Sequence, residues 1–207
     1  MTSFVYTKSY EAPPINGKEI LRYAGVRGDA TAFLPLMRGC LDEIGDQLIY
    51  KVCYCETDAS TDGDTVSLGG LTVRSSDLSR SLSGCHGAIL FAATVGIAVD
   101  RLILRYANLS PTKALFFQSI GAERIESLCD LFTAEMEQEK ATAGCLLRPR
   151  FSAGYGDLPL SLQSDLFALL DPARHIGVTL NESLLMTPTK SVTAIVGYYK
   201  NQVVERV

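Results

Sequence analysis

The sequence predicts an α+β fold in which a twisted, largely antiparallel sheet is flanked by helices. Helical and strand-like hydrophobic patterns alternate irregularly, without repeated β-α-β units along the 207 residues. The expected strands are short and bounded by turn residues. Because 47% of the residues are hydrophobic and 20% are charged, the composition is that of a globular protein. We expect one domain over residues 1–207, with an N-terminal helical and β lobe, residues 1–85, packed on a core of residues 86–207.

Two amphipathic helices are expected first. Asn16 favours the N-cap position, and the helical pattern after it runs to Tyr23, before Gly25. A second helix is expected over residues 29–45, where apolar side chains recur at three- and four-residue intervals. Both helices should direct one face toward the core.

A β-rich stretch follows the second helix. Residues 47–56 are dense in β-branched and aromatic side chains, which favour extended backbone. The Asp, Ser, Thr and Gly residues of the segment 58–64 predict a turn. Two short strands are expected after it, at 65–68 and 71–74.

The next expected elements are a short helix, a buried strand and another helix. Ser76 is expected to cap the short helix, which ends at Gly84. Residues 87–94 are an uninterrupted apolar run, which is typical of a strand buried on both faces. The chain then turns at Gly96 into the helix of residues 97–106.

The longest helix should begin at Ser110 and Pro111, because an N-cap residue is followed by proline at the first helical position. Gly144 is its expected stop. Its core-facing stripe is Phe117, Gly121, Ile125, Leu128, Phe132 and Met136. Its opposite face carries the acidic residues Glu123, Glu126 and Asp130.

The remaining chain is expected to complete the sheet. A strand is predicted at residues 145–150, followed by a Gly-rich loop to Leu162 and a short helix over 164–170. Two further strands are predicted around residues 178–186 and 191–199.

Charge and hydropathy exclude several classes of partner. A net charge of -4 argues against nucleic acid, which requires a basic stripe to replace the counterions of the phosphates. No apolar run approaches the length of a membrane span, and the first residues do not resemble a signal peptide. We therefore expect a cytoplasmic protein without a membrane partner.

The six cysteines are expected to be reduced and to pack as small apolar residues. Cys53 and Cys55 should share one face of a strand. A single C-x-C lacks the second ligand pair of a structural zinc site, so no metal is expected.

Common catalytic signatures are missing from the sequence, among them G-x-S-x-G, the phosphate-binding loop and H-E-x-x-H. Only His86 and His175 could supply an imidazole. A hydrolase that uses Cys85 and His86 would also need a third, orienting group, which the sequence does not identify. We assign no catalytic residue.

The loop after residue 147 is the most informative segment. Arg150 can hold a carboxylate with two parallel hydrogen bonds, and Tyr155 offers an aromatic face with a polar tip. Gly154 and Gly156 leave the backbone open to a planar ligand. These residues suit a zwitterionic, nucleoside-like ligand. A tight turn with a surface arginine explains them almost as well.

Two motifs resemble one family. Arg150 to Tyr155 follow R-x-x-x-G-Y, and Asn181 to Val192 are similar to T-E-S-x-x-M-x-P-x-x-S-V. Both patterns belong, in this order and spacing, to the activation domain of cobalamin-dependent methionine synthase. The resemblance is strong over residues 147–196 and weaker over 87–139. It implies the same α+β fold.

The resemblance also implies a site for S-adenosylmethionine. Arg150 would bind the ligand's carboxylate. The loop and its tyrosine would hold the rest of the ligand through Ser152, Ala153, Gly154, Tyr155, Gly156 and Asp157. An acidic residue of the long helix takes part in the family, and Ser127 aligns at that position. Glu126 beside it or Glu123 could replace it; the alternative is that each is an ordinary solvated helix charge. The motif around Glu182 is expected to shape the sheet edge beside the loop.

The activity that the resemblance implies is reductive remethylation of cobalamin in methionine biosynthesis. Inactive cobalamin accepts an electron and then a methyl group from S-adenosylmethionine, so both reactive atoms belong to cofactors. The chain lacks the D-x-H-x-x-G cobalamin motif. We therefore expect a stand-alone homologue, an accessory component of a methyltransferase, that serves a separate methionine synthase or corrinoid protein. Flavodoxin is a candidate electron donor. The alternative is an interaction module that docks on a corrinoid protein without binding ligand.

Overall fold

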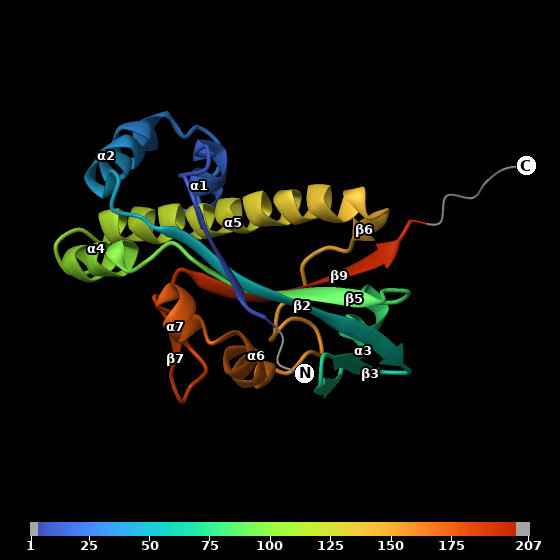
Figure 1. Ribbon diagram of the computed structural model, residues 1–207. Coiled ribbons are helices and arrows are strands. Elements are labelled where there is room, and N and C mark those ends of the chain that lie inside the picture. The colour runs from blue at the N-terminus through green and yellow to red at the C-terminus, as the bar shows by residue number, and fades with distance from the viewer. Residues whose placement is uncertain (1–3, 202–207) are drawn as a thin grey trace, which may run out of the picture.

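The computed structural model describes residues 4–201, in which seven strands form one sheet with helices on both faces (Figure 1). The spatial order is β4-β3-β2-β5-β9-β6, and β1 also pairs with β2. All of these pairings are antiparallel. The strands are β1 (Tyr6–Tyr10), β2 (Tyr50–Asp62), β3 (Thr65–Leu68), β4 (Leu71–Arg74), β5 (Gly87–Thr94), β6 (Cys145–Leu147) and β9 (Ser191–Lys200). The predicted α+β fold with a largely antiparallel sheet is confirmed.

Strand β2 is long enough to pair with three other strands. Its first half pairs with β1, where Tyr50 lies opposite Tyr10. Its second half pairs with β3, where Asp62 lies opposite Thr65. Strand β5 runs along its other edge. Strands from both sides of residue 85 therefore share one sheet.

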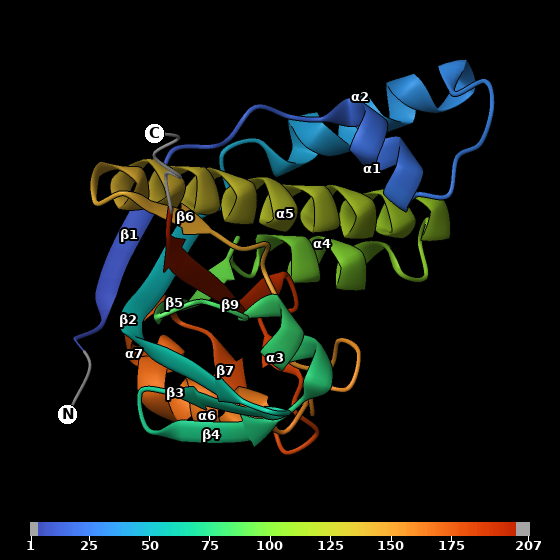
Figure 2. The same ribbon diagram turned by 90° about the vertical axis from the view of Figure 1, so that its right-hand side faces the viewer.

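The helices form two layers, one on each face of the sheet (Figures 1 and 2). One layer consists of α5 (Pro111–Thr142) with α1 (Gly17–Tyr23), α2 (Leu34–Ile44) and α4 (Ala98–Tyr106) around it. The other layer consists of α3 (Ser76–Ser81), α6 (Leu162–Leu170) and α7 (Pro172–Ile176). Apolar clusters fill the space between the sheet and each layer. The sheet is thus covered on both faces, and β5 is buried along its whole length, as predicted.

The helix starts follow the predicted capping chemistry at two places. The Asn16 side chain accepts a hydrogen bond from the Glu19 backbone N–H, and Ser110 accepts one from Lys113. The predicted stripe of α5 is buried, from Phe117 to Met136. The prediction that Glu123 lies on the face opposite the core was wrong, because its side chain is buried.

Several predicted boundaries were wrong. Residues 58–64 do not form one turn, because β2 continues to Asp62. Burial of Thr57 and Ala59 and the hairpin with β3 favour the longer strand. Only Gly63 and Asp64 remain to form the turn. The short helix is capped by Ser75, not Ser76, since the Ser75 side chain accepts from the Leu78 N–H.

Other elements are shorter than predicted or were missed. Residues 178–186 do not form one strand but a small hairpin, β7 (Thr179–Leu180) with β8 (Met186–Thr187). The predicted strand at 145–150 ends at Leu147. The second helix begins only after a 3-10 turn, Thr31–Phe33. Strand β1 and helix α7 had no sequence prediction.

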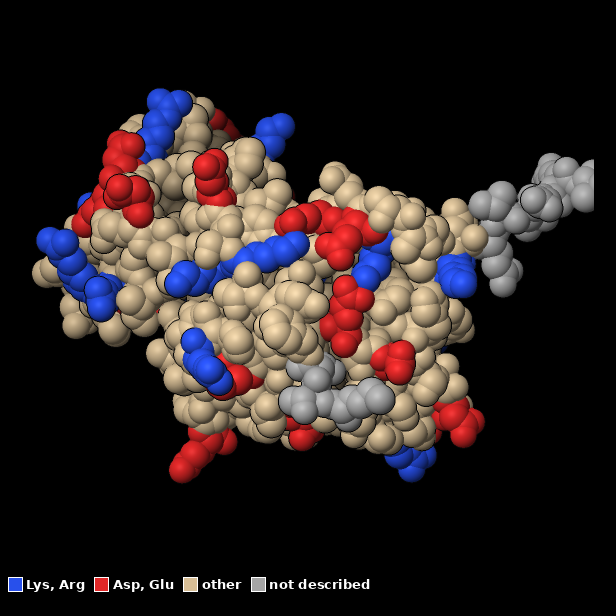
Figure 3. Space-filling model, in the orientation of Figure 1, with Lys and Arg blue, Asp and Glu red and all other residues tan. Residues whose placement is uncertain are grey.

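Three features of the described residues concern possible partners: surface charge, cysteines and helices. On the face shown in Figure 3, acidic and basic side chains are interspersed. All six cysteines are unpaired, and burial raises the pKa of Cys53 to about 12 and of Cys55 to about 11. Within residues 4–201, no group of three His, Cys, Asp or Glu side chains is arranged to hold a metal ion. In the same part of the chain, no helix has both the length and the apolarity to cross a bilayer.

Candidate functional site

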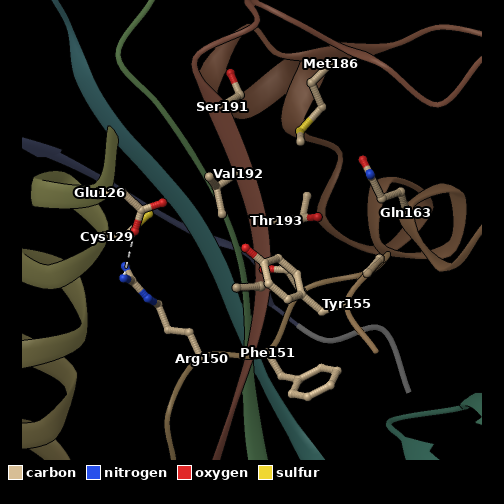
Figure 4. A pocket seen from close by; sticks show the side chains of 13 residues that line it. Glu126, Cys129, Arg150, Phe151, Tyr155, Gln163, Met186, Ser191, Val192 and Thr193 are labelled. Atoms are coloured by element: carbon tan, nitrogen blue, oxygen red, sulfur yellow. Dashed lines mark hydrogen bonds and ion pairs between the residues drawn. The ribbon is translucent and has the colours of Figure 1, made fainter. Parts of the chain in front are cut away.

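The informative loop leaves β6 and crosses the edge of β9. The Phe151 backbone exchanges two hydrogen bonds with Ile195, at N–O distances of 2.9 and 2.8 Å. This bridge fixes the position of Arg150 beside α5 (Figure 4). The loop then turns on itself, with the Gly154 N–H donating to the Leu158 carbonyl over 3.0 Å.

Asp157 fastens the far end of this loop to the start of α3. Its carboxylate accepts hydrogen bonds from the Ser75 hydroxyl and from the backbone N–H groups of Ser76 (2.7 Å) and Asp77 (3.2 Å). Gly156 has φ 54°, and a Cβ there would lie 2.2 Å from an Asp77 carboxylate oxygen. The close approach of loop and helix therefore requires glycine.

Replacing Asp157 with asparagine is expected to lower the melting temperature at pH 7. The hydrogen bond from Ser75 is the main cause that lowers the pKa of Asp157 below its usual value. Its stabilising contribution is therefore complete above the unfolded pKa of about 3.9 and is lost as the pH falls through the folded pKa. The difference between variant and parent should shrink in that acidic range. Thermal unfolding as a function of pH measures it, with exposed Asp62→Asn as control; equal melting temperatures at pH 7 would rule out this role.

Arg150 is held by two carboxylates and still has an unused donor. Its Nη2 atom donates to Glu126 Oε2 over 3.1 Å and to Asp130 Oδ1 over 2.8 Å. Its Nη1 atom is buried and has no hydrogen-bond partner within the described chain. Because a buried, unsatisfied donor is costly, this atom indicates a place for an acceptor that the protein does not supply.

A cleft of about 490 Å³ lies beside Arg150, between α5, β9 and α6 (Figure 4). Its volume is within the usual range of small-molecule sites. The lining residues come from five segments and are Glu126, Cys129, Arg150, Phe151, Ser152, Ala153, Tyr155, Gln163, Met186, Ser191, Val192, Thr193 and Ala194. The cleft combines a charged end at Arg150 with a mainly apolar wall.

The structure brings most of the predicted site residues together. Five of them line the cleft: Glu126, Arg150, Ser152, Ala153 and Tyr155. Gly154, Gly156 and Asp157 shape the loop outside the lining. Glu123 also lies outside the lining, paired with Arg124. Of the two acidic candidates, Glu126 is therefore the one beside Arg150.

Sequence reasoning missed several residues of the cleft. Met186, Ser191 and Val192 belong to the second motif, to which a structural role at the sheet edge was given. Cys129 carries no distinguishing signal, and burial raises the pKa of its thiol to about 12. Gln163 was included in no motif, although it is 6% exposed and its Oε1 atom has no partner within the described residues.

The histidines lie apart from this cleft. His86 packs edge-on against Tyr198, with ring centroids 5.1 Å apart, and His175 Nδ1 lies 3.1 Å from the Thr7 hydroxyl. Burial raises the pKa of Cys85, which disfavours the thiolate that a nucleophile requires. These contacts give no support to a hydrolase.

Comparisons with known proteins agree with the resemblance. A family model described as "Vitamin B12 dependent methionine synthase, activation domain" matches residues 88–203. A crystal structure of the MetH reactivation domain bound to AdoHcy superposes with a TM-score of 0.70 and 14% sequence identity. The alignment covers 94% of this chain and 78% of that one. At this identity the superposition shows the fold alone. No curated protein matches the sequence.

Proposed function

Because the chain belongs to the family of the vitamin B12-dependent methionine synthase activation domain, we propose that it binds S-adenosylmethionine in this cleft and supports reductive methylation of cobalamin on another protein. The observation that carries the proposal is the unused Arg150 Nη1 donor, buried at the charged end of the cleft. The partner would be a methionine synthase or another corrinoid protein. An electron donor such as flavodoxin would reduce its cobalamin.

The residues of the cleft fit this ligand. A guanidinium donor without a partner suits a carboxylate, and charge-assisted hydrogen bonds of this kind are the strong ones. The ligand's ammonium group would lie near the carboxylates of Glu126 and Asp130, which already gather at Arg150. Phe151, Met186 and the β9 side chains supply apolar surface for the uncharged parts. The related fold, that of the MetH reactivation domain, was solved with AdoHcy bound.

The protein's own contribution would be to orient the ligand. When bound, S-adenosylmethionine supplies a methyl group on a positively charged sulfur, which the partner's cobalamin accepts. Arg150 would fix one end of the ligand, while the apolar wall excludes water from the rest. Tyr155, which lines the cleft, is 69% exposed, so its aromatic side chain is available to a covering partner.

Calorimetric titration with S-adenosylmethionine tests the binding half of the proposal. We expect saturable, one-site binding to the full chain at neutral pH. The same titration with ATP is the control, because ATP shares the adenosine but has no amino-acid group for Arg150. If S-adenosylmethionine does not bind while a complex with a corrinoid protein still forms, the chain is an interaction module instead.

A spectroscopic assay tests the second half. The protein is mixed with a methionine synthase that lacks its own activation domain, together with a reductant and S-adenosylmethionine. The cob(II)alamin spectrum should convert to that of methylcobalamin only when this chain is present. An unchanged spectrum with a cognate corrinoid protein, despite normal ligand binding, would refute the reactivation role.

A further inference from the structure

Gln163 is a buried polar side chain whose carbonyl oxygen accepts no hydrogen bond from the described residues. It lies in the first turn of α6, is 6% exposed and lines the cleft. Its Oε1 atom has no hydrogen-bond partner among the residues described. An orphaned carbonyl of this kind costs folding free energy, so a side chain that keeps it needs another reason to be there.

The orphaned atoms are concentrated in the cleft. Three buried side-chain atoms lack partners in the described chain: Arg148 Nε, Arg150 Nη1 and Gln163 Oε1. Arg148 lies elsewhere, stacked on the Tyr199 ring at 4.3 Å and bonded to the Ser83 carbonyl. The other two line the same cleft, and Figure 4 shows Arg150 and Gln163 on opposite sides of it with Tyr155 between them.

The two ends of the cleft offer different chemistry. At the Arg150 end, charges gather: one guanidinium and the carboxylates of Glu126 and Asp130. At the Gln163 end, the neighbours that line the cleft are neutral, namely Met186, Thr193 and Tyr155. An elongated ligand with a zwitterionic end at Arg150 must therefore place its uncharged end near Gln163.

A carboxamide presents one acceptor beside one donor. This pattern complements the edge of a 6-aminopurine, where an N–H donor lies beside a ring-nitrogen acceptor. The buried Oε1 is the acceptor that lacks a donor, and the exocyclic amino group of adenine supplies one. We infer that Gln163 recognises the 6-amino edge of the adenine base and makes the cleft selective for adenine, an inference that rests on the proposed function.

The inference predicts discrimination between two ligands that differ only at this amino group. The probes are S-adenosylhomocysteine and its 6-deamino purine analogue, which keeps the ring nitrogens but has no exocyclic donor. The parent protein should bind the analogue at least about 10-fold more weakly, because the analogue leaves Oε1 unsatisfied. Calorimetry or competitive displacement measures both dissociation constants.

Gln163→Met should remove this discrimination, bringing the two dissociation constants within about 2-fold, because methionine has similar size but no carboxamide. The variant without ligand should melt at or above the temperature of the parent, since the orphaned acceptor is gone. If Gln163 had only a structural role, Gln163→Met would not be expected to stay stable and at the same time lose its selectivity for the base. Gln163→Leu serves as the second variant if the methionine variant does not fold.

Arg150→Ala is the matched control at the other end of the cleft. It should weaken both ligands by the same factor and leave their ratio unchanged. Equal binding of the two ligands by the parent, or a ratio that survives Gln163→Met, would overturn the role of Gln163 while leaving the proposed function intact. Failure of the parent to bind S-adenosylhomocysteine at all would instead overturn the proposed function.

Discussion

Arg124→Met should destabilise the protein by about 3–5 kcal/mol, because it leaves the Glu123 carboxylate buried without its partner. The two side chains are 3% and 2% exposed, and the Arg124 Nε atom lies 2.6 Å from Glu123 Oε2. Arg124 also donates to the carbonyl oxygens of Pro13 (2.6 Å) and Pro14 (2.7 Å). The variant therefore breaks the contact between α5 and the segment before α1 as well as the ion pair.

Urea denaturation followed by circular dichroism measures this loss. Removing both charges together, in Glu123→Gln with Arg124→Met, should cost less than Arg124→Met alone, because no unpaired carboxylate remains. Arg22→Met is the matched control, since its partner Glu19 lies on an exposed face of α1, and little change is expected there. A loss for Arg124→Met no larger than that of the control would contradict the importance of the buried pair.

Arg150→Ala should weaken S-adenosylmethionine binding by about 1.5–3 kcal/mol, which is about a 10- to 150-fold increase in the dissociation constant. The reason is that Nη1 is buried without a partner among the described residues, and under the proposed function it would donate to the ligand's carboxylate. Arg150→Lys should restore only part of the affinity. A lysine ammonium group cannot contact both carboxylates and also donate to the ligand, as the planar guanidinium can. Calorimetric titration gives the constants.

The fold should survive Arg150→Ala. Glu126 and Asp130 have side chains that are 48% and 73% exposed, so water can solvate them once the arginine is gone. An unchanged melting temperature together with weakened binding would assign the effect to the site. Parent-like affinity of the alanine variant would show that the ligand's carboxylate does not depend on Arg150.

Local chemistry accounts for the elements that the sequence predicted well. Strand β5 is a continuous apolar run, and α5 begins with Ser110 and Pro111, so neither depends on distant residues to be recognised. Strand β1 is different, because Tyr6–Tyr10 has no clear apolar alternation and becomes a strand only by pairing with residues 50–54. The same holds for residues 58–62, whose turn-like composition is overridden by the hairpin with β3.

Part of the lining of the candidate cleft was predictable where a motif pointed to it. Arg150 and Tyr155 follow from the loop pattern, and both line the cleft. The burial of Glu123 could not be foreseen, because neighbouring residues on a helix do not face each other and the pair closes only around the Pro13 and Pro14 carbonyls. The location of Gln163 in the cleft could not be predicted either, because the cleft is formed by segments that are distant in the sequence.

The pairing of β5 with β9 has a consequence for how the protein is made. Thr94 and Ser191 are hydrogen-bonded side by side in this pair although they are 97 residues apart in the chain. During synthesis, β5 emerges from the ribosome long before the strand that covers its edge, and contacts between such distant residues form slowly. Because β9 also lines the cleft, the proposed ligand binding is expected only after β9 has paired with β5. Capture of a nascent chain by the ligand would thus report that its folding is finished.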